Sequence, residues 1–183
     1  PMDYTPGIFD TKLDFMGDLP HGQVQTTLCK QLALYVTLYS PLQMAADLVD
    51  NYEKHMDAFQ FIKDVAVDWD ESKYIEAEPG DYITIARKAK NSGNWFVGGI
   101  TDENARTAEF KLDFLDADKK YVATLYADGK DADYKDNPTS YQIKKGIVTS
   151  KTKISVKEAR SGGFALSLME ATGDDLKSVK KWR

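Results

Sequence analysis

The spacing of apolar residues changes once along this chain, between Ser40 and Lys88, and it does not change back. Before Trp69 the apolar residues recur every three or four positions, which is the spacing of amphipathic helices. After Tyr74 they alternate with polar residues, which is the spacing of half-buried β-strands. Helices and strands that are separate along a chain are typical of two architectural units. The sequence therefore predicts a helical segment joined to a β-domain, and we call residues 40–88 the seam.

Two helices are expected before the change of spacing. The first ends near Ser40-Pro41, and its apolar face is formed by Val24, Leu28, Leu32, Tyr35, Val36 and Tyr39. The second can be capped by Asp50 or Asn51, and its apolar face is formed by Tyr52, Met56, Phe59 and Ile62. These faces bury little by themselves, so they need a partner surface, either the β-domain or elements outside this chain.

About eight short strands are expected after the change. They cover 81–86, 95–100, the alternation at Phe110, Leu112 and Phe114, and then 121–127, 141–143, 146–148, 153–156 and 164–168. Turn-forming residues separate them, for example at Pro79-Gly80 and Asp128-Gly129. Short strands at regular spacing predict an antiparallel β-sandwich or barrel.

The composition excludes several classes of function. The formal net charge is −5 and the sequence pI is about 5.1, which argues against a nucleic-acid partner. A short basic tail, Lys177 to Arg183, is expected to be solvated or frayed. One cysteine, Cys29, cannot form an internal disulfide, and with only His21 and His55 it cannot complete a zinc site. No apolar run is long enough for a membrane helix, so no membrane partner is expected.

Acidic residues at the seam resemble those of a sugar-binding site, because Asp68, Asp70 and Glu71 flank the aromatic residue Trp69. The alternative is that the acids serve as turn and cap groups and that the tryptophan packs between units, and this alternative is favoured. The neighbouring carboxylates of Glu76 and Glu78 are expected to be solvated.

Other chemical motifs fail their templates. The Asp-rich segment from Asp128 to Asp136 resembles a calcium loop, but an EF-hand that began at Asp131 would place Asp136 where glycine is required and Gln142 where glutamate is required. There is no nucleophile elbow, Walker loop or dinucleotide fingerprint. We therefore predict no catalytic residue and no metal ligand in this chain.

Six segments in a fixed order resemble the C-terminal part of glycoside hydrolase family 97, over about residues 1–170. They are Pro1-Met-Asp-Tyr-Thr-Pro-Gly7, Lys30-Gln-Leu-Ala-Leu-Tyr-Val36, Ser40-Pro-Leu-Gln-Met-Ala-Ala-Asp-Leu48, Phe59-Gln-Phe-Ile-Lys-Asp-Val65, Asp68-Trp-Asp70 and Glu78-Pro-Gly-Asp-Tyr-Ile83. Members of this family are α-glucosidases and α-galactosidases of bacterial glycan-utilisation systems. They are similar in plan, with an N-terminal β-sandwich, a central (β/α)8 barrel and a C-terminal antiparallel β-domain.

The resemblance implies a division of this chain. Residues 1–69 would be the end of the catalytic barrel, with its closing strand and helices. Residues 70–172 would be the C-terminal β-sandwich, and residues 173–183 a basic tail. Asp3 and Tyr4 would then lie near the C-terminal face of the barrel, where active sites form, and they are our candidates for lining a substrate cleft.

The resemblance also implies what the chain lacks. The family's catalytic carboxylates and its calcium-binding glutamates would lie upstream, in a longer parent enzyme that binds an oligosaccharide substrate. We expect the parent to be periplasmic and active, and this chain to be inactive by itself, with the remainder of the barrel as its partner. Two other functions stay open: a non-catalytic carbohydrate-binding module, and a free-standing interaction domain whose helices cover their own β-core.

Overall fold

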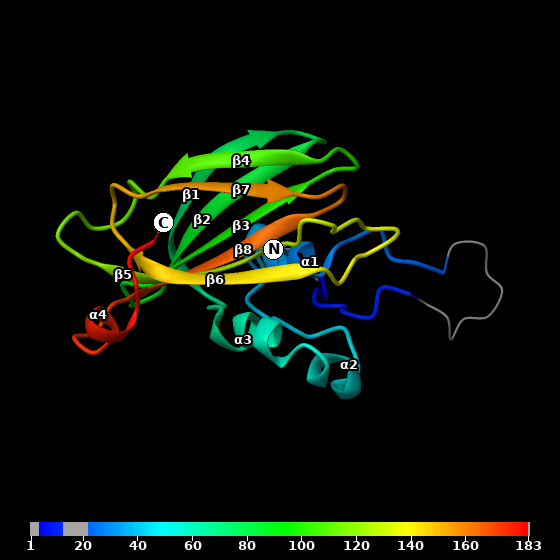
Figure 1. The fold of residues 1–183 in the computed structure, drawn as a ribbon, viewed down its shortest axis with the longest axis horizontal. Helices are drawn as coiled ribbons and strands as arrows, with labels where there is room; N and C mark the ends of the chain where they lie inside the picture. The colour runs from blue at the N-terminus through cyan, green and yellow to red at the C-terminus, as the bar shows by residue number, and fades with distance from the viewer. Residues whose placement is uncertain (1–3, 13–21, 183) are drawn as a thin grey trace.

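The computed structural model describes residues 4–12 and 22–182, which form four helices and eight strands. The helices are α1 (Leu28–Thr37), α2 (Val49–Glu53), α3 (Met56–Asp64) and α4 (Asp175–Ser178). The strands are β1 (Trp69–Glu78), β2 (Tyr82–Ala89), β3 (Trp95–Thr101), β4 (Arg106–Lys111), β5 (Tyr121–Asp128), β6 (Tyr141–Val148), β7 (Lys153–Glu158) and β8 (Gly163–Glu170). The prediction of a mostly β chain with helices before the strands is confirmed (Figure 1).

The strands form two antiparallel sheets. The large sheet has the order β1-β2-β3-β8-β5-β6, and the small sheet pairs β4 with β7. In the large sheet the last strand, β8, lies between β3 and β5, where Trp95 pairs with Leu168 and Tyr121 pairs with Glu170. The small sheet covers one face of the large sheet, so the predicted antiparallel β-sandwich is confirmed (Figure 1).

The first hydrophobic core lies between the two sheets. Residues of β7 alternate strictly between exposed and buried, so Ile154 and Val156 point inward to the large sheet. Phe110 of β4 stacks on Phe164 of β8, with ring centroids 5.8 Å apart and an interplanar angle of 17°. The alternation that predicted these strands is therefore the alternation of a sandwich core.

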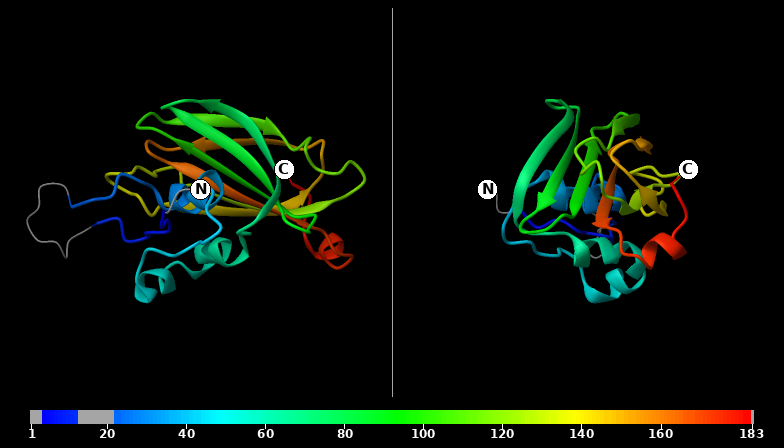
Figure 2. Two further views of the ribbon diagram at one scale, coloured as in Figure 1. Left: turned by 180° about the vertical axis from the view of Figure 1, so that it is seen from behind. Right: turned by 90° about the vertical axis from the view of Figure 1, so that its left-hand side faces the viewer.

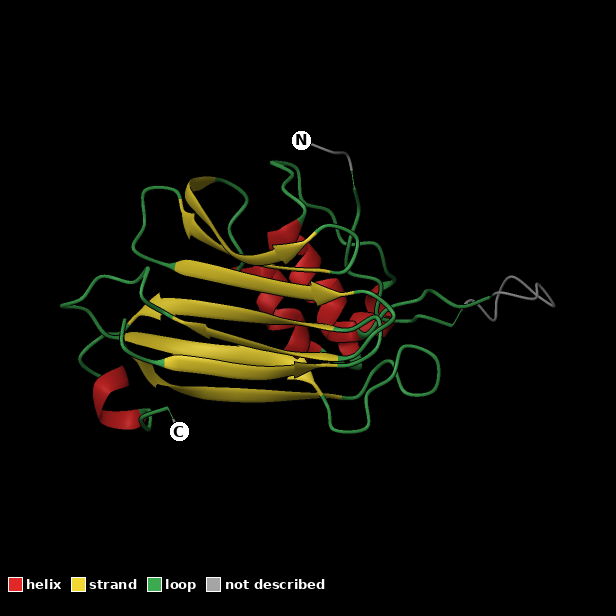
Figure 3. Cartoon of the chain, turned by 90° about the horizontal axis from the view of Figure 1, so that it is seen from above, coloured by secondary structure: helices red, strands yellow, loops and turns green. Residues whose placement is uncertain are grey.

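The second hydrophobic core lies on the opposite face of the large sheet, which is covered by α1 and α3 (Figures 2 and 3). Phe61 of α3 contacts Phe96 and Tyr126 of the sheet edge-on, with centroid distances of 6.1 and 5.5 Å. The helical segment thus finds its partner surface in the β-domain, which was one of the two expected alternatives.

Helix α1 approaches the sheet most closely at Gly98 of β3. A Cβ atom at this position would lie 2.7 Å from the carbonyl oxygen of Ala33 and 3.0 Å from Cβ of Val36. Only glycine leaves room for this contact, so Gly98 inside a strand marks the place where helix and sheet backbones meet.

The helix boundaries differ from the predicted ones. Helix α1 begins at Leu28, four residues after Val24, because Thr27 is extended and its Oγ1 accepts a hydrogen bond from the N–H of Lys30 as an N-cap. The predicted second helix is two helices that break at His55. Met56 was wrongly assigned to its apolar face: it is exposed, and Ala58 and Phe61 are buried instead.

Two further predictions, one about a strand and one about the basic tail, are also corrected. The strand expected through Phe114 ends at Lys111, and Leu112 and Leu115 form a turn whose side chains still enter the core. The basic tail is not frayed over its described part: Trp182 N–H donates to the Ile147 carbonyl at 3.0 Å, and Ile147 N–H donates to the Lys180 carbonyl at 2.8 Å. The tail therefore lies along the outer edge of β6.

Within the seam, α3 is followed directly by β1, and side chains before and after this junction share one core. Val65 and the partly buried Trp69 pack in the same cluster as Phe96 of the large sheet. The division into residues 1–69, 70–172 and 173–183 stays a prediction. No helix in the described part of the chain is long and apolar enough to cross a membrane.

Candidate functional site

The acidic residues of the seam are held by local hydrogen bonds. Asp68 accepts from the N–H of Trp69 at 2.9 Å and from Lys90 Nζ at 2.6 Å, and Asp70 accepts from the N–H of Asn91 at 2.9 Å. The indole of Trp69 lies edge-on to Phe96, with centroids 5.8 Å apart. The prediction that the acids serve as turn and cap groups is confirmed for Asp68 and Asp70, and the tryptophan packs at the joint as predicted. Glu71 lies on β1 and pairs with exposed Lys73 instead.

The Asp-rich loop between β5 and β6 uses its carboxylates in the same way. Asp131 accepts from Asn137 Nδ2 at 2.9 Å and from Ser140 Oγ, and Asp133 accepts from Arg160 Nε at 2.8 Å. Across residues 4–12 and 22–182, no three His, Cys, Asp or Glu side chains gather closely enough to hold a metal ion. These carboxylates hold the loop in shape.

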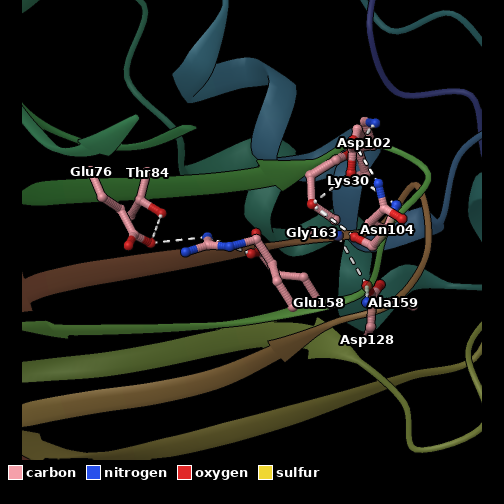
Figure 4. A network of polar contacts seen from close by, with 11 residues as sticks. Lys30, Glu76, Thr84, Asp102, Asn104, Asp128, Glu158, Ala159 and Gly163 are labelled. Atoms are coloured by element: carbon pink, nitrogen blue, oxygen red, sulfur yellow. Dashed lines mark hydrogen bonds and ion pairs between the residues drawn. The ribbon is translucent and has the colours of Figure 1, made fainter. Parts of the chain in front are cut away.

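Asp128 and Glu158 are two buried carboxylates; Glu158 was not singled out from the sequence, and Asp128 was considered only as the start of the Asp-rich segment and as a turn residue. Asp128 Oδ2 accepts from the N–H groups of Ala159 and Gly163, at 2.8 and 2.9 Å, and so holds the turn between β7 and β8 (Figure 4). A Cβ atom on Gly162 would lie 2.1 Å from this oxygen, so glycine is required for the approach. The sequence pattern could have indicated that Glu158 points inward, since strand alternation places it on the same face as Ile154 and Val156.

Burial governs the protonation of both groups. It raises the pKa of Asp128 to about 6, although the two backbone N–H groups act in the opposite direction. It raises the pKa of Glu158 to about 7, although Arg106 lowers it. Asp128 Oδ1 and Glu158 Oε1 are buried without a hydrogen-bond partner among the described residues. The pair is therefore costly to keep charged.

Arg106 balances Glu158 and joins the two sheets; its two acidic partners, Glu76 and Glu158, are labelled in Figure 4. Its Nη1 lies 2.9 Å from Glu158 Oε2 on β7 and 3.0 Å from Glu76 Oε1 on β1, and Thr84 Oγ1 donates to the same Glu76 oxygen at 2.9 Å. Its guanidinium also lies 3.8 Å from the ring centroid of Tyr82. Glu76 is thus part of an ion cluster, which corrects the prediction that it is merely solvated.

A second partly buried cation lies at the same end of the sandwich. Lys30 Nζ donates to the Thr101 carbonyl at 2.7 Å, and burial lowers its pKa while Asp102, Asp128 and Glu158 act in the opposite direction. Figure 4 shows this polar network running from β1 to the turn after β7. Each charged member makes a backbone or ion-pair contact, so the network ties elements together.

A cavity of about 620 Å³ lies beside the network, between the ends of β5, β6 and β7. Asp128, Glu158, Lys157 and Trp182 are among its lining residues. The Trp182 ring is flanked by Gly146 and by Lys144, whose Nζ lies 4.1 Å from the ring centroid. The ring is thus a packing element and not a free platform for a sugar ring.

The candidate cleft residues lie at the start of the chain. Asp3 falls outside the described residues, and Tyr4 is half-buried. The segment after Tyr4 is fastened to α1, since Gln31 Oε1 accepts from the N–H groups of Gly7 and Ile8 at 3.0 and 3.3 Å. Cys29 is fully buried, and burial raises the pKa of its thiol well above the usual value, so it is not a nucleophile. His21 lies outside the described residues.

The β-domain matches a known protein family. Residues 68–169, more than half of the chain, match the family described as "Glycosyl-hydrolase 97 C-terminal, oligomerisation". The chain belongs to this glycoside hydrolase 97 family. The match begins at Asp68, in the seam, and it ends within β8, so it covers both sheets.

This chain is also similar to individual proteins. It is 39% identical over 175 residues to a retaining α-galactosidase of Bacteroides thetaiotaomicron, and 26% identical over 164 residues to a probable retaining α-galactosidase of Streptomyces bingchenggensis. The alignments cover 92% and 90% of this chain, but 25% and 23% of the relatives.

A solved structure extends the similarity to the fold. A glycoside hydrolase family 97 enzyme from Pseudoalteromonas sp. strain K8, in complex with acarbose, superposes with a TM-score of 0.88 and 49% sequence identity. The match covers 94% of this chain and 27% of that enzyme. The chain therefore spans about a quarter of the length of the relatives it matches, and the match to 94% of this chain extends beyond the β-domain into the helical segment.

Proposed function

We propose that this chain is the C-terminal portion of a family 97-like glycosidase that acts on α-galactosidic or α-glucosidic bonds, and that it serves as a structural and assembly domain. The proposal rests on the family and on how much of its members this chain covers. The similarity runs over nearly the whole chain but over only a quarter of each relative. The family is described by oligomerisation, which is an assembly role.

The contacts of the described residues support a non-catalytic role. A glycosidase needs a pair of carboxyl groups open to substrate, one to protonate the leaving oxygen and one to attack carbon or to activate water. The paired buried carboxyls here, Asp128 and Glu158, hold a turn and an arginine instead. The catalytic groups would thus belong to the preceding part of the parent, with Asp3 and Tyr4 as the residues of this chain nearest to them.

Calcium, an expected cofactor of the parent, would also be held upstream. The carboxylates of the Asp-rich loop accept hydrogen bonds from neighbouring side chains and backbone, and no three suitable ligands gather in the described part of the chain. The oligosaccharide would reach this domain only through the parent, and the parent is proposed to be periplasmic, by resemblance to glycan-utilisation enzymes.

The carbohydrate-binding alternative gains no support from the described surface. Such a module presents several aromatic rings on one exposed sheet face. Among the described aromatic residues Tyr74 of β1 is the one that is mainly exposed, at 71%.

The test is hydrolysis of nitrophenyl α-galactoside and nitrophenyl α-glucoside by two purified proteins. We expect turnover by the full-length parent and none above buffer by residues 1–183. Turnover by the 183-residue chain, or an inactive full-length protein, would contradict the proposal. Titration of the chain with maltooligosaccharides, followed by tryptophan fluorescence, checks the carbohydrate-binding alternative.

A further inference from the structure

One side of the β-sandwich is open between β1, the outermost strand of the large sheet, and β4 of the small sheet (Figure 1). Arg106 of β4 bridges the two strands at one end, where its Nη1 lies 3.0 Å from Glu76 Oε1. Farther along, a hollow of about 610 Å³ lies between residues 73–75 of β1, residues 109–111 of β4 and residues 113–114 of the turn after β4. We call the residues that line this hollow the open side.

Each of these two strands has one unpaired backbone edge. In the described part of the chain β1 pairs with β2 alone, and β4 pairs with β7 alone. An unpaired edge can add a strand from another molecule. The pairing of β1 with β2 shifts register between Trp69 and Glu71 and again between Tyr74 and Glu76. The regular stretch between these shifts, residues 71–74, is therefore where a further strand would fit.

The centre of the open side is apolar. Tyr74 lines the hollow and is 71% exposed. Ile75 and Phe114 line it as well, and both are partly buried where they pack on the first hydrophobic core. An apolar centre within a polar rim is the usual anatomy of a protein interface, and tyrosine is a common anchor in such a centre. The open side therefore has the composition of a surface that binds another protein.

The charged side chains of the open side balance one another. Two are basic, Lys73 and Lys111, and two are acidic, Glu109 and Asp113, although the whole chain has a formal net charge of −5. Two copies that meet through this side therefore bring no excess of like charge together. A strongly acidic or strongly basic partner would find no complementary field here, so the charge balance favours a second copy of the chain.

The charges of β1 are also self-complementary. Lys73 Nζ lies 2.6 Å from Glu71 Oε1 on the same strand, and both side chains are exposed. When two β1 strands pair antiparallel with their Ser72 residues opposite each other, Lys73 of each copy lies opposite Glu71 of the other copy. Both ion pairs can then form between the copies, in the two-fold symmetric arrangement of a dimer of identical chains.

We propose that two copies of this chain meet through the open side, with their β1 strands paired antiparallel about a two-fold axis. The inference rests on the proposed function, because it names the surface and the partner of the assembly role. One such contact covers the free β1 edges of both copies. Helices α1 and α3 lie on the face of the large sheet opposite to β4, so the contact leaves them free for the rest of the parent (Figure 2).

The test substitutes Tyr74 with Lys in the full-length parent. Lysine on an edge strand opposes the addition of a further strand, and the exposed position tolerates the change. Ile143→Lys, at an exposed apolar residue of β6 on the other edge of the large sheet, is the matched control. In light scattering over a range of concentrations we expect dimers of the wild type and of Ile143→Lys. For Tyr74→Lys the dissociation constant should rise about thirtyfold, which corresponds to about 2 kcal/mol.

Two further measurements locate the contact. Amide hydrogens of residues 71–74 should exchange more slowly in the wild-type dimer than after dilution to the monomer. Lys73→Glu should weaken the dimer, because it places a carboxylate opposite Glu71 of the other copy, and the double variant Glu71→Lys with Lys73→Glu should restore it. These charge variants keep the test decisive if Tyr74→Lys fails to fold, which circular dichroism would show.

Three outcomes would overturn the proposal. A dimer that neither Tyr74→Lys nor Lys73→Glu weakens would reject the open side as its interface. Concentration-dependent protection in residues 41–56 in place of residues 71–74 would show that the helical face covers the second copy instead. A parent that is monomeric at every concentration would reject the assembly role as well. Hydrolysis of nitrophenyl α-galactoside is recorded in parallel: an active parent with an unaffected dimer rejects the open side alone, whereas an inactive parent rejects the proposed function.

Discussion

Arg106 and Glu158 face each other at the paired ends of β4 and β7, with Arg106 Nη1 2.9 Å from Glu158 Oε2. The same nitrogen lies 3.0 Å from Glu76 Oε1 on β1, in the other sheet. One cation thus links the edge of the large sheet to the small sheet, at a place where the Glu158 side chain has no exposed surface.

Removing this cation should destabilise the domain strongly. We expect Arg106→Met to lower the free energy of unfolding by about 3 kcal/mol, because it leaves Glu158 buried without a countercharge. Urea unfolding of residues 1–183 measures the change. Lys73→Met, which removes an exposed partner of Glu71, is the control and should cost about 1 kcal/mol or less. The pair Arg106→Met with Glu158→Leu should recover most of the loss; no recovery would contradict the electrostatic cause.

The stability of the domain should fall as pH rises from 5 to 8. Burial raises the pKa of Asp128 to about 6 and that of Glu158 to about 7, whereas both groups titrate at about pH 4 in an unfolded chain. Between these values the folded state binds more protons than the unfolded state, so raising the pH from 5 to 8 favours unfolding, by roughly 4 kcal/mol in total. Urea unfolding across this range should show the slope, and Glu158→Gln should flatten it. A stability that rises with pH would disprove these assignments.

Gly98→Ala should push α1 away from the large sheet. The new Cβ would lie 2.7 Å from the Ala33 carbonyl oxygen, so the helix must shift, at a cost of about 1–3 kcal/mol. Gly173→Ala is the matched control, because nothing lies within 4 Å of that position. Thermal melts followed by circular dichroism measure both variants, and equal melting temperatures would argue against the close helix–sheet contact.

Asp47→Ala should loosen two segments without unfolding the core. The four hydrogen bonds to its carboxylate hold residues 9–10 and the start of α2, and the hydrophobic cores do not include it. We expect faster amide hydrogen exchange in residues 4–10 and 41–51 and unchanged exchange in β3 and β8. Exposed Asp50→Ala is the control; the same change in both variants would show that the carboxylate of Asp47 has no special role.

Local patterns in the sequence were sufficient for most of the strands. Strands β2, β3, β5 and β8 were predicted within a few residues because alternation and turn residues are encoded locally. The two-helix break at His55 was missed because α2 and α3 keep a helical spacing across the break. The prediction that Met56 lies on the buried face was wrong because of tertiary packing: Phe61, and not Met56, faces the aromatic rings of the sheet.

The polar network could not be derived in the same way. Arg106, Glu76 and Glu158 belong to strands that are far apart in the sequence, and only the packing of one sheet on the other brings them together. Strand alternation could have marked Glu158 as an inward carboxylate, but not its partner. The fastening of the loop between α1 and α2 likewise depends on a contact between residues 9–10 and Asp47 that no local pattern encodes.

The central place of β8 has a consequence for synthesis on the ribosome. The strand that separates β3 from β5 is the last to be translated, so the facing edges of both neighbours stay open until residues 163–170 have left the exit tunnel. The large sheet cannot close until β8 has been translated, so its folding must wait for strands that are far apart in the sequence. A nascent chain that stalls before Gly163 would present two unpaired edges to other proteins.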